Sequence, residues 1–249
     1  MPYATNDHVR IYYERIGSGP PLLLHHGSIG SGEDWRDFGY VDALSADHQV
    51  ILMDARGHGR SDKPHEPAAY DLKLRAMDVA AVLDDLGLQA ADYFGYSMGG
   101  WIGFGLAKYA PERASALILG GAHPYPEDMT AFRNLIPQQP QAFVELIEPA
   151  FGQYLTPGMR QRCLMNDLVA LRALTQDRSS LADALPNISM PSMIFVGEAD
   201  PRFPLVKRCS EQLPNTAFFS LPGCDHVSAC ARSELVLPHI RGFLASLTR

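Results

Sequence analysis

Six residues near the middle of the chain, Gly95-Tyr96-Ser97-Met98-Gly99-Gly100, constrain its fold more than any other stretch. The apolar run 90–94 before them predicts a strand, and residues 101–109 after them predict a helix. A Gly-x-Ser-x-Gly pattern between a strand and a helix is typical of the nucleophile elbow, a turn so tight that the central serine is strained. The five-residue pattern alone is weak, since it also suits a glycine-rich helix start packed on a sheet. Its position between strand and helix favours Ser97 as a nucleophile.

Apolar strands and amphipathic helices alternate along most of the chain. Further strands are expected at 9–16, 21–26, 49–54, 116–119, 192–196 and 217–221, and further helices at 35–44, 72–86, 205–213 and 227–247. Uninterrupted apolar strands that alternate with helices are typical of a mainly parallel sheet covered on both faces. The sequence therefore predicts the α/β class.

The alternation stops between residues 124 and 186. This segment has a helical pattern, is interrupted by several prolines and contains no convincing strand. We expect a helical cap at 124–186, inserted into a core formed by residues 1–123 and 187–249. The large apolar cap residues suit either a pocket wall or the core of the cap itself, and the sequence does not distinguish the two for Phe132, Leu135, Phe143, Leu146 and Met165.

Charge and composition exclude several classes of function. The formal net charge of −7 and the lack of a basic stripe argue against nucleic acid as a partner. The apolar runs are too short to span a bilayer, and residues 1–7 lack the pattern of a signal peptide, so we expect a cytoplasmic protein that does not bind membranes. The four cysteines lack metal-ligand spacing and are expected to be free thiols, although the spacing of Cys224 and Cys230 also allows a disulfide. No pattern predicts the oligomeric state.

A serine hydroxyl needs a base, and the base needs an acid that orients it. With the elbow, the expected chain order is serine, acid, histidine, and each residue lies on a loop after a strand. Asp200 follows the strand at 192–196, and His226 follows the strand at 217–221. Glu198 is a weaker candidate for the acid, and Asp225 is expected to face away because neighbouring side chains point apart. The predicted triad is Ser97, Asp200 and His226.

The oxyanion of a tetrahedral intermediate requires two preorganised N–H donors. One is expected from the amide of Met98, the residue after the nucleophile, and the other from the loop after the strand at 21–26. In that loop the amide of Ser28 is the first choice and that of Ile29 the second.

Other polar clusters have a structural interpretation. His25 and His26 have no acidic partner at metal-ligand spacing, so we expect them to shape a loop rather than bind a metal. Asp54, Arg56 and His58 are expected to form a buried ion-pair network that holds their loop beneath the strand at 21–26. Asp54 is not expected to be a nucleophile because Ser97 occupies the elbow.

Together these segments resemble the α/β-hydrolase fold family across nearly the whole chain. The matching motifs are His26-Gly27, Asp54-x-Arg56-Gly57-His58-Gly59-x-Ser61, the elbow, Gly197-x-x-Asp200 and Gly223-x-x-His226. The resemblance implies an eight-stranded, mostly parallel sheet, a helical cap and no cofactor or metal.

Departures from the motifs narrow the branch. Dehalogenases and epoxide hydrolases of this fold carry aspartate in place of Ser97. Carbon–carbon bond hydrolases often carry tryptophan after the histidine, where this chain has Val227, and perhydrolases tend to carry proline near the position of Ile29. The resemblance therefore favours carboxylesterases and enol-lactone hydrolases. We expect hydrolysis of a small carboxylic ester or lactone through an acyl-serine; the alternatives are a carbon–carbon hydrolase, a perhydrolase or a small-molecule receptor without turnover.

Overall fold

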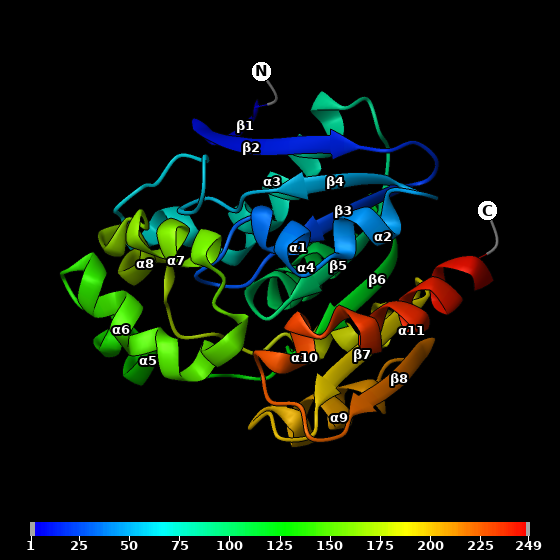
Figure 1. Cartoon of the computed structure of the whole chain (residues 1–249). Coiled ribbons are helices and arrows are strands. Elements are labelled where there is room, and N and C mark those ends of the chain that lie inside the picture. Colours follow the sequence, from blue (N-terminus) through cyan, green and yellow to red (C-terminus); the bar gives the residue numbers. More distant parts are fainter. Residues whose placement is uncertain (1–2, 248–249) are drawn as a thin grey trace.

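A single eight-stranded sheet organises the computed structural model, which describes residues 3–247 (Figure 1). The strand order is β1-β2-β4-β3-β5-β6-β7-β8. Their bounds are Tyr3–Asn6 for β1, Val9–Ile16 for β2, Pro21–His25 for β3, Gln49–Met53 for β4, Ala91–Tyr96 for β5, Ala114–Gly120 for β6, Ser192–Gly197 for β7 and Thr216–Leu221 for β8. The pairs β1–β2 and β2–β4 are antiparallel, and the other pairs are parallel. The expected α/β class with a mostly parallel sheet is confirmed.

Helices cover both faces of this sheet (Figure 1). One face carries α3, α4 and α9, and the other carries α1, α2, α10 and α11. The bounds are Glu33–Asp37 for α1, Tyr40–Leu44 for α2, Leu72–Asp85 for α3, Met98–Tyr109 for α4, Phe203–Ser210 for α9, Ser228–Ala231 for α10 and Ser233–Ser246 for α11. Short 3-10 helices span Pro67–Tyr70 (η1) and Pro111–Arg113 (η2).

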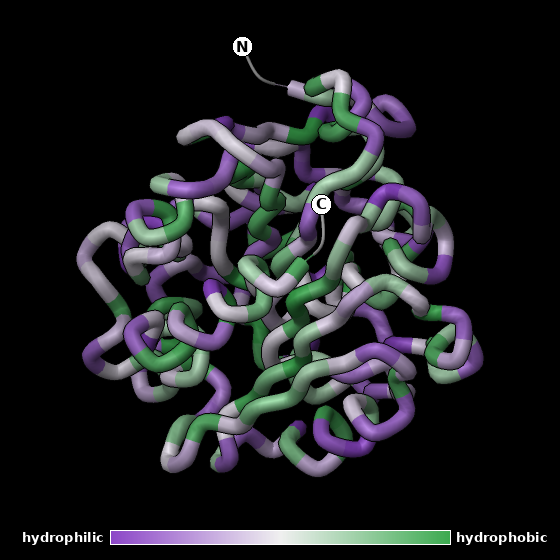
Figure 2. The backbone as a smooth tube through the Cα atoms, turned by 90° about the vertical axis from the view of Figure 1, so that its right-hand side faces the viewer, coloured by the Kyte–Doolittle hydropathy of each residue, from purple (hydrophilic) through white to green (hydrophobic). Residues whose placement is uncertain are grey.

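The strands bury side chains on both faces because each face has a helical layer. In β3, Leu23 belongs to the apolar cluster under α3 and α4, whereas Leu22 and Leu24 belong to the cluster under α2 and α11. All three are fully buried. Figure 2 shows the hydrophobic stretches running through the middle of the molecule and the hydrophilic ones on its outer loops.

The segment between β6 and β7 is helical, with one isolated bridge between Glu127 and Arg178. It contains α5 (Thr130–Leu135), α6 (Pro140–Phe151), η3 (Gly152–Tyr154), α7 (Pro157–Leu164), α8 (Leu168–Leu174) and η4 (Ala182–Asn187). In Figure 1, helices α5 to α8 gather on the left, the side toward which the arrowheads of β3 and β4 point. We keep the name cap for residues 124–186; its status as a separate domain stays a prediction.

Local signals in the cap sequence explain several of its helix boundaries. Pro140 and Pro157 stand at the first positions of α6 and α7, where a missing N–H costs nothing. The Asp167 carboxylate accepts hydrogen bonds from the amides of Val169 and Ala170 and so caps α8. The prolines that interrupt the pattern therefore mark helix starts in two cases.

Three details differ from the sequence-based expectations. Strand β1 was not expected. The helix expected at 35–44 is two helices, because Gly39 has a left-handed backbone with φ of 80°. The terminal helix is likewise broken at Arg232 between α10 and α11.

All four cysteines are free in the structure, so Cys224 and Cys230 do not form a disulfide. Within residues 3–247, no helix has both the length and the apolar character that crossing a bilayer requires.

Candidate active site

The elbow serine lies where β5 ends and α4 begins. Ser97 has φ of 54° and ψ of −109°, a strained conformation for a residue with a side chain. The strain is held by hydrogen bonds on either side: the Ser97 amide donates to the carbonyl of Gly120 at 2.8 Å, and the Trp101 amide donates to the Ser97 carbonyl at 2.9 Å. The turn between strand and helix therefore has the strained geometry that an elbow requires.

Glycine is required on both sides of Ser97 because backbone atoms approach too closely for any side chain. A Cβ on Gly95 would lie 2.3 Å from the carbonyl oxygen of Gly99, and one on Gly99 would lie 2.2 Å from the carbonyl oxygen of His25. Tyr93 supports the same turn by donating from its hydroxyl to the Gly99 carbonyl at 2.7 Å. These contacts pack the start of α4 directly against the end of β3.

Three loops at the carboxyl ends of parallel strands bring the predicted triad together. The Ser97 hydroxyl donates to Nε2 of His226 over 2.9 Å, and Nδ1–H of His226 donates to Oδ2 of Asp200 over 2.5 Å. A carboxylate only accepts hydrogen bonds, so this arrangement assigns the proton to Nδ1 and leaves Nε2 as the acceptor. The geometry is that of a nucleophile, a base and an acid that orients the base.

The weaker acid candidates are turned away from His226. Glu198 accepts a hydrogen bond from the Ser220 hydroxyl at 2.8 Å. Asp225 accepts from the amide and the hydroxyl of Ser228 at 2.8 and 2.6 Å. Of the three acids, only Asp200 contacts the imidazole.

Asp200 is held in its charged form. Its side chain is fully buried, and burial alone would raise its pKa, but the hydrogen bond and charge of His226 and the Arg202 amide keep the pKa of Asp200 below its ordinary value. The carboxylate can therefore stabilise an imidazolium at neutral pH.

The two amides expected to bind an oxyanion lie on either side of Ser97. Across residues 3–247, neither the Ser28 amide nor the Met98 amide has a protein acceptor. The carbonyl of Gly27, which shares a peptide group with the Ser28 amide, accepts from Nδ1–H of His26 at 2.7 Å and from the Gly30 amide at 3.2 Å. These two bonds fix the plane of that peptide. The roles of Ser28 and Met98, and of the Ile29 alternative, stay predictions.

Two buried histidines support this loop. Nε2 of His26 accepts from the Ala55 amide at 3.0 Å, and Nε2–H of His58 donates to the Ser28 carbonyl at 2.5 Å. Burial lowers the pKa of His26 to about 4 and that of His58 to about 3. His26 and His58 therefore shape the loop at Gly27 and Ser28, from which an oxyanion donor is expected.

The ion-pair network expected from Asp54, Arg56 and His58 is different in the structure. Arg56 pairs with Asp78 on α3 at 2.5 Å, and both side chains are buried. Asp54 instead accepts from the amides of Gly32 and Arg60 at 2.7 and 2.8 Å. The partner of Arg56 comes from a later helix, which no local pattern indicated.

A mostly apolar cavity of about 560 Å³ opens beside Ser97 and His226 and also includes Ser28. The cap supplies much of its wall, including four of the five apolar residues whose place the sequence left open: Phe132, Leu135, Phe143 and Leu146. The fifth, Met165, is 75% exposed and lies at a neighbouring hollow. Met98 and Ser28 also line a small space of about 20 Å³ behind the elbow.

Sequence reasoning did not identify the charged residues of this cavity. Glu127, Arg178 and Arg202 line it together with the apolar wall. Arg202 lies two positions after Asp200, which was the only available signal. The other two lie at the ends of the cap and meet through the isolated bridge.

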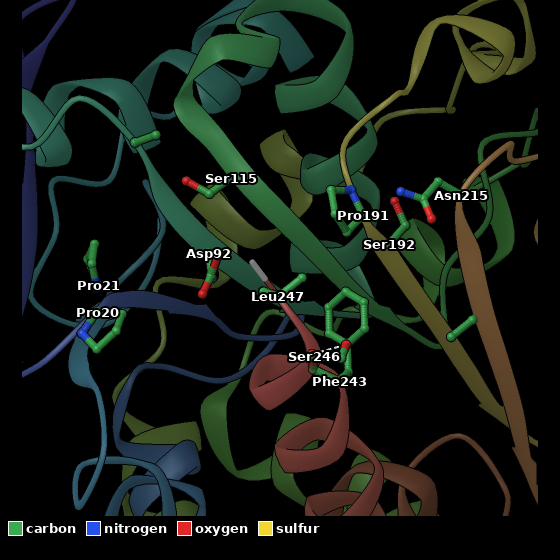
Figure 3. Close-up of a pocket in the computed structure, with 12 residues that line it drawn as sticks. Pro20, Pro21, Asp92, Ser115, Pro191, Ser192, Asn215, Phe243, Ser246 and Leu247 are labelled. Carbon is green, nitrogen blue, oxygen red and sulfur yellow. Dashed lines mark hydrogen bonds between the residues drawn. The ribbon is translucent and has the colours of Figure 1, made fainter. Parts of the chain in front are cut away.

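A larger hollow of about 850 Å³ lies at the amino ends of the strands, on the opposite edge of the sheet (Figure 3). Its polar lining comes from residues such as Asp92, Ser115, Ser192 and Asn215 (Figure 3). It contains no member of the triad, and ligands of open α/β sheets bind at the carboxyl ends of the strands. The cavity at Ser97 is therefore the candidate active site.

Comparison with known proteins agrees with the fold. The family model of the alpha/beta hydrolase fold matches residues 20–179, which include the elbow. A provisionally assigned carbamate hydrolase, RutD, from Azorhizobium caulinodans is 42% identical over 119 residues, 48% of this chain and 43% of the relative, so the chain spans less than half of that protein in the match. The bifunctional esterase/perhydrolase DCH from Acinetobacter calcoaceticus is 26% identical and covers 97% of this chain and 98% of its own.

Among solved structures, the enol-lactonase from Burkholderia xenovorans LB400 superimposes with a TM-score of 0.88 at 21% identity, covering 98% of this chain and 100% of that one. At that identity the likeness shows the fold alone. The family model covers more than half of the residues, and the sheet order and elbow fit it. The chain belongs to the alpha/beta hydrolase fold family.

Proposed function

We propose that this hydrolase cleaves a small carboxylic ester or lactone through an acyl-Ser97 intermediate. The observation that carries the proposal is the hydrogen-bonded series from Ser97 to His226 to Asp200 at the wall of a mostly apolar cavity. A relative named as a bifunctional esterase/perhydrolase supports the choice of an ester as substrate. Fold alone does not determine chemistry, so the proposal rests on the site.

In the first half-reaction, the Ser97 oxygen attacks the carbonyl carbon while Nε2 of His226 takes its proton. The resulting oxyanion accepts hydrogen bonds from the amides of Ser28 and Met98, each worth about 3 kcal/mol by analogy with other oxyanion donors. The imidazolium, stabilised by Asp200, then gives its proton to the leaving alcohol oxygen as the carbon–oxygen bond breaks.

In the second half-reaction, His226 takes a proton from water, and the hydroxide attacks the acyl carbon. Collapse of the second tetrahedral intermediate returns the proton to Ser97 and releases the carboxylic acid. No redox change or cofactor enters either step. The four free thiols favour a reducing compartment such as the cytoplasm as the place of action.

Turnover of p-nitrophenyl butyrate by wild type and by Ser97→Ala tests the proposal. The variant removes one oxygen from a partly exposed site, so we expect an unchanged melting temperature and a rate loss of at least about a thousandfold. A fluorophosphonate probe followed by peptide mass spectrometry should add its mass to Ser97. Wild-type activity in Ser97→Ala, or labelling of another residue, would contradict the acyl-serine mechanism.

A further inference from the structure

Two arginines and one glutamate form a charged cluster in the wall of the active-site cavity. We call Glu127, Arg178 and Arg202 the guanidinium cluster. Oε2 of Glu127 accepts from Nη1 of Arg178 at 2.8 Å, and its other oxygen accepts from Nη2 of Arg202. All three line the same cavity as Ser97 and His226, in an otherwise mostly apolar wall.

Most donors of the cluster have no protein acceptor. A guanidinium carries five N–H groups. Within the part of the chain that the structure describes, the side chain of Arg178 uses only Nη1 and that of Arg202 only Nη2. The Arg178 side chain is 8% exposed, and Nε of Arg202 is buried without a partner. Donors in such sites are normally satisfied, and because both arginines line the cavity, their remaining N–H groups other than the buried Nε of Arg202 are available to whatever enters it.

The positive charge of the cluster also exceeds the negative charge that it contains. Two guanidinium groups share one carboxylate, Glu127. Arg178 and a third cation, Arg75, both lie over the ring of Trp101. Their guanidinium carbons are 4.9 and 5.5 Å from the centre of that ring. Arg75 is buried and has no carboxylate within 4.0 Å among residues 3–247. Burial lowers the pKa of both Arg75 and Arg178 to about 10, so both remain charged at neutral pH.

The other two acids that line the cavity, Asp34 and Asp128, have other partners. Asp34 pairs with Arg162 at 2.7 Å, on the side of the cavity that borders α7. Asp128 is exposed, and its carboxylate accepts from the Thr130 amide at 2.8 Å. Neither acid forms an ion pair with Arg178 or Arg202.

We propose that the guanidinium cluster binds a free carboxylate of the substrate, so that the preferred substrates are esters or lactones that carry a second, ionised carboxyl group. The planar fork of a guanidinium matches a carboxylate in a paired geometry. The cluster itself, two arginines and one glutamate, carries one net positive charge, which suits a singly charged group better than a doubly charged phosphate. This inference rests on the proposed ester hydrolysis.

Matched pairs of methyl esters test the substrate class. The half-esters monomethyl succinate, glutarate, adipate and pimelate carry one carboxylate, and the corresponding dimethyl esters carry none. We expect kcat/KM at neutral pH to be at least about tenfold higher for the half-ester of one chain length, as charged hydrogen bonds predict. The best chain length measures the distance from Ser97 to the cluster. Equal values for half-esters and dimethyl esters at every length would overturn the inference.

Substitutions in the cluster separate binding from a structural role. Arg178→Gln should raise KM for the half-ester and remove its advantage over the dimethyl ester. Glu127→Gln frees both guanidinium groups and should increase that advantage. If the cluster serves only to join the cap to the loop after β7, both variants lower the melting temperature and leave the ratio unchanged. The matched control is Arg160→Gln, an exposed arginine paired with Glu148 at 2.6 Å, which should change neither.

A binding measurement does not depend on turnover. Calorimetric titration of Ser97→Ala with monomethyl adipate should show binding that Arg178→Gln in the same background abolishes, while dimethyl adipate binds weakly to both. Tighter binding of a phosphonate of the same length than of the carboxylate would overturn the assignment. If half-esters and dimethyl esters are hydrolysed equally well, this inference alone is wrong. If hydrolysis persists in Ser97→Ala, the proposed function is wrong.

Discussion

The hydroxyl of Tyr96 donates a hydrogen bond to the backbone carbonyl of His226 over 2.7 Å, although 130 positions separate the two residues. Tyr96 immediately precedes Ser97 and is 4% exposed. Tyr96, the last residue of β5, therefore holds the backbone of the loop that carries His226. We expect the distance between the Ser97 hydroxyl and the His226 imidazole to depend on this contact.

Tyr96→Phe removes that bond and leaves the ring in place. We expect kcat on p-nitrophenyl butyrate to fall by about ten- to a hundredfold, because small displacements of a reacting group are costly, while KM changes little. The free energy of unfolding should fall by about 1 kcal/mol. Tyr40→Phe is the matched control, since the buried Tyr40 hydroxyl donates to the Cys230 carbonyl of α10 at 2.8 Å and not to the backbone of His226 itself. Equal losses of kcat in the two variants would show that Tyr96 does not position His226.

Asp200 is expected to be the only acid that orients the imidazole of His226. Asp200→Asn preserves size but favours the wrong imidazole tautomer, so we expect kcat to fall by roughly 10³- to 10⁴-fold with little loss of stability. Asp225→Asn and Glu198→Gln, whose carboxylates face Ser228 and Ser220, should remain near wild type. A larger loss in either control than in Asp200→Asn would reassign the acid.

The sequence pattern was sufficient to predict the parallel part of the sheet and to propose the order of the candidate triad. Buried parallel strands are continuous apolar runs, and the elbow fixes where the acid and the histidine must follow. Strand β1 was missed because only four residues form it and Thr5 and Asn6 are polar. Gly39 divides a helical pattern through its backbone conformation, which side-chain periodicity does not report.

Long-range polar pairs could not be predicted in the same way. Glu127 pairs with Arg178 and Arg202, which are 51 and 75 residues away along the chain. Arg56 pairs with Asp78 rather than with Asp54, which is nearer in the sequence. Charge partners depend on how the cap and the loops pack, and no local period encodes that packing. The apolar wall of the cavity also could not be predicted, because the same residue types build the core of a cap and the sequence does not show which of them face the cavity.

Acid should destabilise the protein through the histidines under the oxyanion loop. The unfolded chain binds protons near pH 6.5, whereas burial lowers the pKa of His58 to about 3 and that of His26 to about 4. Between these values the unfolded state binds more protons, so stability is full above pH 6.5 and is lost as the pH falls. At pH 5 each histidine should cost about 2 kcal/mol relative to pH 7.

Urea unfolding of His58→Gln at pH 5 and pH 7 measures this contribution. Gln retains an N–H donor toward the Ser28 carbonyl but does not titrate, so the difference between the two pH values should shrink by about 2 kcal/mol. The control His8→Gln changes an exposed histidine in the turn between β1 and β2 and should leave the difference as in wild type. An unaltered pH difference in His58→Gln would mean that His58 is already protonated in the folded state.

Two glycines inside helices differ in whether a side chain can replace their hydrogen atom. Gly99 lies in α4 and Gly242 in α11, so Ala gains helix propensity at both positions. A Cβ at Gly99 would lie 2.2 Å from the backbone oxygen of His25, whereas one at Gly242 would meet nothing within 4 Å. Gly242→Ala should therefore stabilise the protein by about 0.5–1 kcal/mol.

Gly99→Ala should instead destabilise the protein by about 2 kcal/mol or more, because neither backbone segment can move without displacing the other. Since α4 would be pushed away from the end of β3, the Met98 amide would shift relative to Ser97, and turnover of p-nitrophenyl butyrate should fall along with stability. The two melting temperatures and the two kcat values decide the outcome. A Gly99→Ala variant as stable and as active as Gly242→Ala would mean that the close packing of the elbow against β3 is not needed for the site.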